Sequence, residues 1–87
     1  MVIAFVLIQC NNQSVEWVIE ELKKVESVIE IQGVFGMYDI IIKVQTNDSD
    51  TINKIILTQI RKIEKVKTTL TLLLIDSDKY DYSRISS

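Results

Sequence analysis

Two six-residue segments of this chain follow one pattern, and they constrain the fold more than any other feature. Residues 23–28 read KKVESV and residues 61–66 read RKIEKV, so each has two basic residues, an apolar residue, Glu, a polar residue and Val. Each segment follows an apolar stripe with helical spacing and precedes an apolar run typical of a β-strand. The repeat therefore predicts two strand–helix–strand units, in the order β-α-β-β-α-β.

The first unit contains a fully apolar run and an amphipathic stripe. Val2–Ile8 is apolar at every position, whereas a strand with one solvated face alternates, so we expect both faces to be covered. Trp17 lies nearly opposite the stripe of the helix that follows, where it either covers its neighbours half-exposed or contacts another subunit. Ser14 is a good N-cap for this helix, and its stripe consists of Val15, Val18, Ile19, Leu22 and Val25.

A hairpin and a second helix continue the repeat. We expect strands over Val28–Val34 and Ile40–Val44, joined by a turn over Gly33–Asp39, with Ile29 and Ile31 on one face of the first strand. A loop with N-cap residues follows at positions 46–50. The apolar stripe of the second helix then consists of Ile52, Ile55, Ile56, Ile60 and Ile63.

The last expected strand, Val66–Ile75, places Thr69 and Thr71 on one face and the leucines on the other: Leu70, Leu72 and Leu74. Right-handed crossovers would put both helices on one face of a four-stranded antiparallel sheet, which makes the fold class α+β. The other face of that sheet has no helix. Because the first strand is apolar on both sides, we predict that this open face is buried against another copy of the chain.

Composition narrows the possible functions. A domain of 87 residues buries only about 60% of its unfolded surface, and 47% hydrophobic residues is more than one small sheet can hide, which favours a homo-oligomer. With no histidine and one cysteine, Cys10, we expect no metal site, cofactor or catalytic triad. The net charge of −2 does not favour binding to the negatively charged backbone of a nucleic acid. Without a signal peptide or a bilayer-spanning stretch, we expect a cytoplasmic protein with no membrane partner.

Residues 1–75 form the expected domain, and residues 76–87 form a polar, acidic tail without apolar periodicity. Such tails are ordered only when something ties them down. Tyr80 and Tyr82 would dock on a neighbouring subunit in that case.

The turn within VFGMYDIIIKV, residues 34–44, is the candidate binding feature. Gly36 is one of two glycines and can adopt positive φ at no steric cost, which marks a sharp turn. Asp39 then stands at the mouth of a buried strand. This carboxylate either holds a small zwitterion or caps its own hairpin turn, and the residues alone leave both interpretations open.

The opening VIAFVLI, this hairpin and the final VKTTLTLLLI together resemble the ligand-binding domain of the Lrp/AsnC (feast/famine) transcription regulators, also called the RAM domain. The family pattern is a Gly-x-Tyr/Phe-Asp turn before an apolar strand, and a Thr-x-Thr pair in the last strand. The matching residues here are Gly36, Tyr38 and Asp39, then Thr69 and Thr71.

The resemblance implies a ferredoxin-like fold, sheet-to-sheet dimers of the dimeric α/β barrel type, and larger rings such as octamers. It also implies that small effectors, usually amino acids, bind between dimers near the turn. Asp39 would hold the ligand ammonium group. The ligand carboxylate would accept hydrogen bonds from the backbone N–H groups of Gly36, Met37 and Tyr38 and from the hydroxyls of Thr69 and Thr71.

Some residues depart from the family pattern. Lys65 stands where members often have Gly, and Asn11-Asn12 stands where many also have Gly. The helix-turn-helix domain of full-length members does not precede these residues, so we expect a stand-alone RAM protein. It would not bind DNA itself and would modulate transcription by co-assembly with full-length regulators.

Three other functions are alternatives to this one. A purely structural oligomerisation module would fold from the same sequence. A small ferredoxin-like dimeric enzyme is disfavoured, because Tyr38 and Asp39 are the only acid/base groups near the turn. Single-stranded RNA binding is disfavoured as well, because the sheet has few aromatics and the net charge is negative.

Overall fold

The computed structural model describes residues 1–11 and 14–74, and these form the predicted order of elements. The strands are β1 (Val2–Cys10), β2 (Val28–Gly33), β3 (Ile40–Thr46) and β4 (Val66–Leu73). The helices are α1 (Val15–Leu22) and α2 (Ser49–Ile55), and a π-helical turn, η1 (Ile56–Ile60), continues α2. Ile75 and the predicted tail at 76–87 lie outside the described residues.

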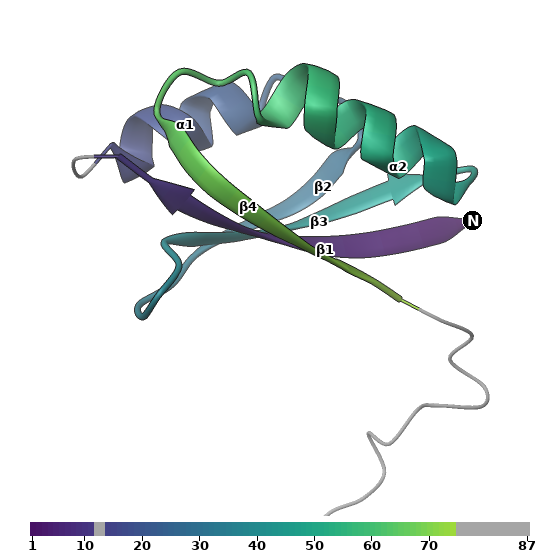
Figure 1. Cartoon of the computed structure of the whole chain (residues 1–87), viewed down its shortest axis with the longest axis horizontal. Coiled ribbons are helices and arrows are strands. Elements are labelled where there is room, and N and C mark those ends of the chain that lie inside the picture. Colours follow the sequence, from purple (N-terminus) through teal and green to yellow (C-terminus); the bar gives the residue numbers. More distant parts are fainter. Residues whose placement is uncertain (12–13, 75–87) are drawn as a thin grey trace, which may run out of the picture.

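The strands form one sheet in the order β2-β3-β1-β4, and every neighbouring pair is antiparallel. Figure 1 shows α1 and α2 side by side on one face of this sheet. This is the ferredoxin-like α+β arrangement predicted from the repeat, because each right-handed crossover leaves room for a strand of the other unit. No described helix is long and apolar enough to span a membrane.

The core lies between the helices and the two central strands. In β1 the residues Ala4, Val6 and Ile8 are fully buried, and they alternate with partly exposed residues. The helices contribute the predicted isoleucines and valines, because the stripe of each helix faces the sheet. The remaining buried core residues are Val18, Leu22, Val25, Ile40, Ile42, Val44, Ile52, Ile55, Ile56 and Ile60.

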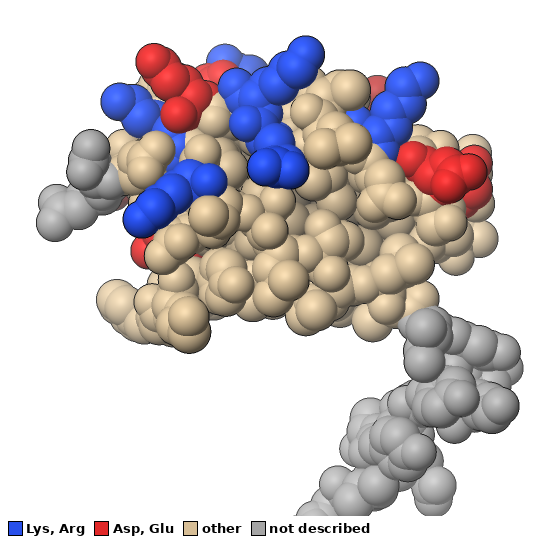
Figure 2. Space-filling model, viewed as in Figure 1, with Lys and Arg blue, Asp and Glu red and all other residues tan. Residues whose placement is uncertain are grey.

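The opposite face of the sheet carries no described helix; it is apolar over β1 and β4 and holds the Lys43–Glu30 ion pair on the β2–β3 side. Phe5 pairs with Leu72 and Leu7 pairs with Leu70 across β1 and β4, on the side away from Val6 and Ile8. Leu70 and Leu72 are 45% and 49% exposed. In Figure 2 the charged residues gather along the helix side, and uncharged residues form the lower part of the molecule. This open face is the surface predicted to meet a second copy.

Two local irregularities differ from the expected periodicity. The register of β2 against β3 shifts between Val28 and Glu30, so Ile29 is 47% exposed instead of sharing the half-buried side of Ile31. A β-bulge of this kind inserts one residue and interrupts the alternation of faces. The second helix widens at its end, where the Arg61 N–H donates to the Ile56 oxygen at 2.8 Å, yet Ile60 stays fully buried.

The start of α2 supports a prediction about acid stability. Asp48 accepts hydrogen bonds from the Thr51 N–H at 2.7 Å and from the Thr51 hydroxyl at 2.8 Å, and these bonds lower the pKa of its carboxyl. Because the folded-state pKa is lowered, the stabilisation is present above the ordinary aspartate pKa and is lost as pH falls through the folded value. We expect Asp48→Ala to lower the thermal midpoint at neutral pH. The matched variant Asp48→Asn keeps a cap acceptor, and its thermal midpoint should depend less on pH in the acid range than that of the wild type. If the plot of thermal midpoint against pH is unchanged in both variants, Asp48 does not have this role.

Candidate functional site

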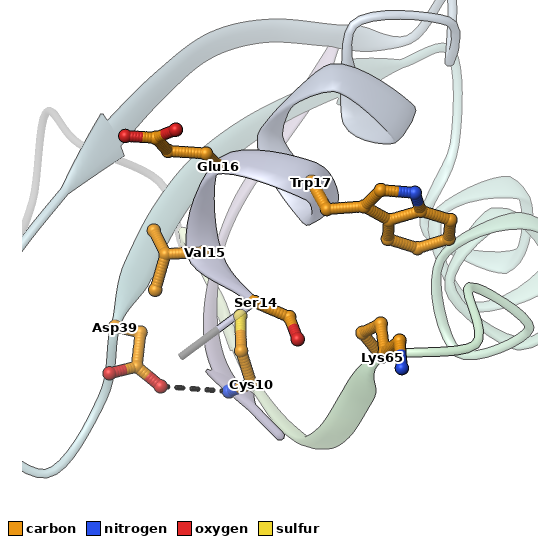
Figure 3. Close-up of a pocket in the computed structure, with 7 residues that line it drawn as sticks. All are labelled: Cys10, Ser14, Val15, Glu16, Trp17, Asp39 and Lys65. Atoms are coloured by element: carbon orange, nitrogen blue, oxygen red, sulfur yellow. Dashed lines mark hydrogen bonds between the residues drawn. The ribbon is translucent and has the colours of Figure 1, made fainter. Parts of the chain in front are cut away.

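Asp39 is held at the end of β1 by its backbone and its side chain. The Asp39 N–H donates to the Ile8 oxygen at 2.9 Å, and the Val34 N–H donates to the Asp39 oxygen at 2.9 Å. The Cys10 N–H donates to Asp39 Oδ2 at 2.8 Å (Figure 3). The carboxylate therefore caps the end of a neighbouring strand, and within the described residues this is its one side-chain hydrogen bond.

The turn before Asp39 projects from the sheet as the hairpin between β2 and β3 (Figure 1). Gly36 has φ 133°, in the region that favours glycine, as the sequence predicts. Phe35 and Met37 are 107% and 82% exposed, whereas Tyr38 is half-buried. The tip therefore presents two largely exposed apolar side chains.

A pocket of about 710 Å³ opens beside Asp39, between the start of α1 and the loop before β4. It contains two acids, one lysine, a hydroxyl, a thiol and an indole. Figure 3 shows these residues, which are Cys10, Ser14, Val15, Glu16, Trp17, Asp39 and Lys65. A second pocket of about 320 Å³ lies on the other side of Asp39 and Val15, and its remaining residues are Gly33, Val34 and Phe35.

The electrostatics of the larger pocket depend on Asp39. Burial raises the pKa of the Cys10 thiol, and the negative charge of Asp39 raises it further, so the thiol stays protonated near neutral pH. The Ser14 side chain makes no cap hydrogen bond to α1, contrary to its predicted role, and its hydroxyl remains a possible partner for a ligand. No group of three or more metal-ligating residues occurs among the described residues.

The match to a known family decides what kind of domain this is. The model of the Lrp/AsnC ligand binding domain matches residues 3–83. The chain belongs to the Lrp/AsnC family. A DNA-binding domain is not part of this match, and the chain spans about half the length of the curated family regulators that it matches.

The relatives of this Lrp/AsnC domain include two kinds of protein. An uncharacterized HTH-type transcriptional regulator of Pyrococcus horikoshii is 31% identical over 84 residues, which cover 97% of this chain and 53% of that protein. A homocitrate synthase of Sulfolobus acidocaldarius is 35% identical over 75 residues, which cover 85% of this chain and only 16% of the enzyme. The domain is thus similar to parts of regulators and to a small part of an enzyme.

Solved structures agree with the Lrp/AsnC fold. A hypothetical protein of Pyrococcus horikoshii has a TM-score of 0.81 and 30% identity, over 94% of this chain and 99% of that one. The structure of E. coli AsnC has a TM-score of 0.82 at 24% identity, over 86% of this chain and 51% of that one, and shows likeness of fold.

Within this Lrp/AsnC domain the predicted site residues occupy two places. Asp39 lines both pockets, and Gly36, Met37 and Tyr38 form the adjacent turn. Thr69 and Thr71 pair with Ile8 and Val6, so they lie on the helix side of β4. Asp39 directly precedes β3, which is separated from β4 by β1. The threonines and Asp39 are therefore two strand spacings apart, roughly 10 Å, and neither described pocket joins them. The six-residue set therefore stays a prediction.

Sequence reasoning did not place Cys10, Ser14, Trp17 and Lys65 in a shared pocket. Trp17 and Lys65 could have been singled out from the sequence, because each departs from an expected residue pattern. Trp17 lies opposite the apolar stripe of α1 and is 44% exposed, and Lys65 differs from the Gly that the family resemblance leads us to expect.

Proposed function

We propose that this Lrp/AsnC domain binds a free amino acid or a similar small effector at Asp39. The observation that carries this proposal is a half-buried carboxylate held at 2.8 Å by the Cys10 N–H, at the wall between two pockets. A ligand ammonium group is a strong partner for such a carboxylate. The family description, a ligand binding domain, supports the same function.

Assembly is part of the proposed function. A dimer forms through the open sheet faces, and larger rings such as an octamer bring the turns of neighbouring dimers together. In such a ring the turn residues Gly36, Met37 and Tyr38 and the Thr69 and Thr71 hydroxyls of different copies would surround one ligand. The domain then acts in the cytoplasm by co-assembly with full-length Lrp/AsnC regulators, without direct DNA contact and without catalysis.

The homocitrate synthase match favours a second candidate, in which the domain regulates such an enzyme. The similarity covers 85% of this chain and 16% of the enzyme, so the matching part is a small portion of that protein. Light scattering of the purified domain mixed with a full-length family regulator, and separately with a homocitrate synthase, distinguishes the two. A mixed assembly with only one of them identifies the partner class.

Loss of the Asp39 charge should weaken ligand binding at least about tenfold, because hydrogen bonds to charged groups are worth about 1.5–3 kcal/mol. The test is calorimetric titration of the twenty amino acids into the wild type and Asp39→Asn. The asparagine variant keeps an acceptor for the Cys10 N–H, so its fold is preserved. Asp50→Asn, at the exposed start of α2, is the matched control. If the wild type binds none of the twenty, the domain is a structural oligomerisation module instead.

A further inference from the structure

Asp39 and Lys65 are two opposite charges that line one pocket without pairing. Both side chains are half-buried. The ion pairs among the described residues are Lys23–Glu20, Lys24–Glu21 and Lys43–Glu30, so Asp39 and Lys65 stand farther apart than a salt bridge allows. A gap of this kind suits a ligand that carries both charges itself.

The chain segments that carry the two charges are both anchored at the end of a single strand. Cys10 donates its N–H to Asp39 Oδ2 at 2.8 Å, and the next residue, Asn11, donates its N–H to the Lys65 oxygen at 2.8 Å. The last residue of β1 and the residue after it therefore position the β2–β3 hairpin on one side and the loop before β4 on the other. The Asp39 carboxylate is therefore preorganised before any ligand enters, and the main chain of Lys65 is fixed near it.

Trp17 supplies an apolar wall for the same pocket. Trp17 is 44% exposed, and Figure 3 shows its indole on the same side of the pocket as Lys65, with Ser14 between Cys10 and these two residues. Glu16 points away from Lys65 and Trp17 in this view. The pocket thus has an acidic side at Asp39 and a cationic side at Lys65, and Trp17 lies over the cationic side.

We propose that this pocket takes one free α-amino acid with an aromatic or large apolar side chain. The ligand ammonium group lies at Asp39, its carboxylate lies at Lys65 and the Ser14 hydroxyl, and its side chain packs on Trp17. The inference rests on the proposed function, and it adds Lys65 and Trp17 as the residues that set selectivity. The smaller pocket lies on the hairpin side of Asp39. The inference places the ligand carboxylate on the opposite side, in the larger pocket. With two acids and one lysine on its wall, the pocket disfavours a dicarboxylic amino acid.

The test uses L-phenylalanine as the probe and L-glutamate as the disfavoured ligand, in calorimetric titration of the full chain. We expect Lys65→Met to raise the Kd for L-phenylalanine at least about tenfold, because a charge-assisted contact is lost. Lys67→Met, at an exposed position outside the pocket, should leave the Kd unchanged. 3-Phenylpropionate lacks the ammonium group and phenethylamine lacks the carboxylate, so each should bind at least about tenfold more weakly.

Trp17 is the only tryptophan of the chain, so its fluorescence reports directly on this pocket. Binding of L-phenylalanine should change the Trp17 emission, and the change should saturate at the calorimetric Kd. Circular dichroism and thermal midpoints of the variants establish that they are folded.

Two results would overturn the inference while the proposed function stands. One is that Lys65→Met binds L-phenylalanine as tightly as the wild type. The other is that an amino acid binds more weakly to Asp39→Asn than to the wild type but does not change the Trp17 emission. That result would assign the ligand to the smaller pocket on the hairpin side. Absence of binding by all twenty amino acids would overturn the inference and the proposed function together.

Discussion

Replacing Ile8 with alanine is expected to lower the free energy of unfolding by about 2–5 kcal/mol, the range for isoleucine at a fully packed site. Ile8 is 0% exposed and lies in the central strand β1, where it pairs with Ile40 on one side and Thr69 on the other. Small domains have only about 5–15 kcal/mol of total stability, so the variant should be close to unfolding. Urea denaturation at one fixed protein concentration measures the loss.

Leu57→Ala is the control for this substitution. Leu57 is 57% exposed on η1, and surface substitutions usually change stability by no more than about 0.5 kcal/mol. A midpoint for Ile8→Ala equal to that of Leu57→Ala would mean that the face of β1 toward the helices is not the core.

Leu72→Glu is expected to convert an assembled protein into monomers of 10.0 kDa, measured by light scattering. Leu72 of the edge strand β4 pairs with Phe5 on the open face, so in a sheet-to-sheet dimer its substitute would bury a carboxylate. An uncompensated buried charge costs several kcal/mol, enough to dissociate a dimer of two small sheets. Lys43 approaches Phe5, but it is already paired with Glu30 at 3.3 Å.

Leu57→Glu is the matched control for this experiment, since it makes the same change at a similarly exposed leucine on the helix side. It should retain the wild-type mass. If the wild type itself is a monomer, or if Leu72→Glu keeps the wild-type mass, the open face does not mediate assembly.

These two variants also separate the roles of assembly and ligand binding. The pocket of Asp39, Trp17 and Lys65 lies within one chain, so a folded Leu72→Glu monomer should still show the Trp17 response to a bound amino acid. The turn residues and the threonines are predicted to meet only between copies, so any contribution from them should disappear with the assembly.

Much of the fold was predictable because its signals are local. The stripes with helical spacing correctly marked Val18, Leu22, Ile52 and Ile60 as buried, since a helix places every third or fourth residue on one side. Ile29 was misplaced, because the bulge in β2 depends on pairing with β3 and has no signature in the strand itself.

The candidate site was predictable only at Asp39. Its pocket partners come from distant segments: Cys10 from β1, Trp17 from α1 and Lys65 from the loop before β4. Their meeting depends on the register of β1 with both of its neighbours, including the shift between Gln9 and Cys10. No spacing along the chain encodes that register.

The sequence by itself thus determined the elements, their order and the apolar side of each helix, because periodicity acts over a few residues. The tertiary structure decided which polar side chains share a pocket and that Asp39 and Lys65 stand apart in it. The placement of the two segments that carry them follows from hydrogen bonds that Cys10 and Asn11 make to residues far away in the chain, and such contacts exist only once the sheet has formed.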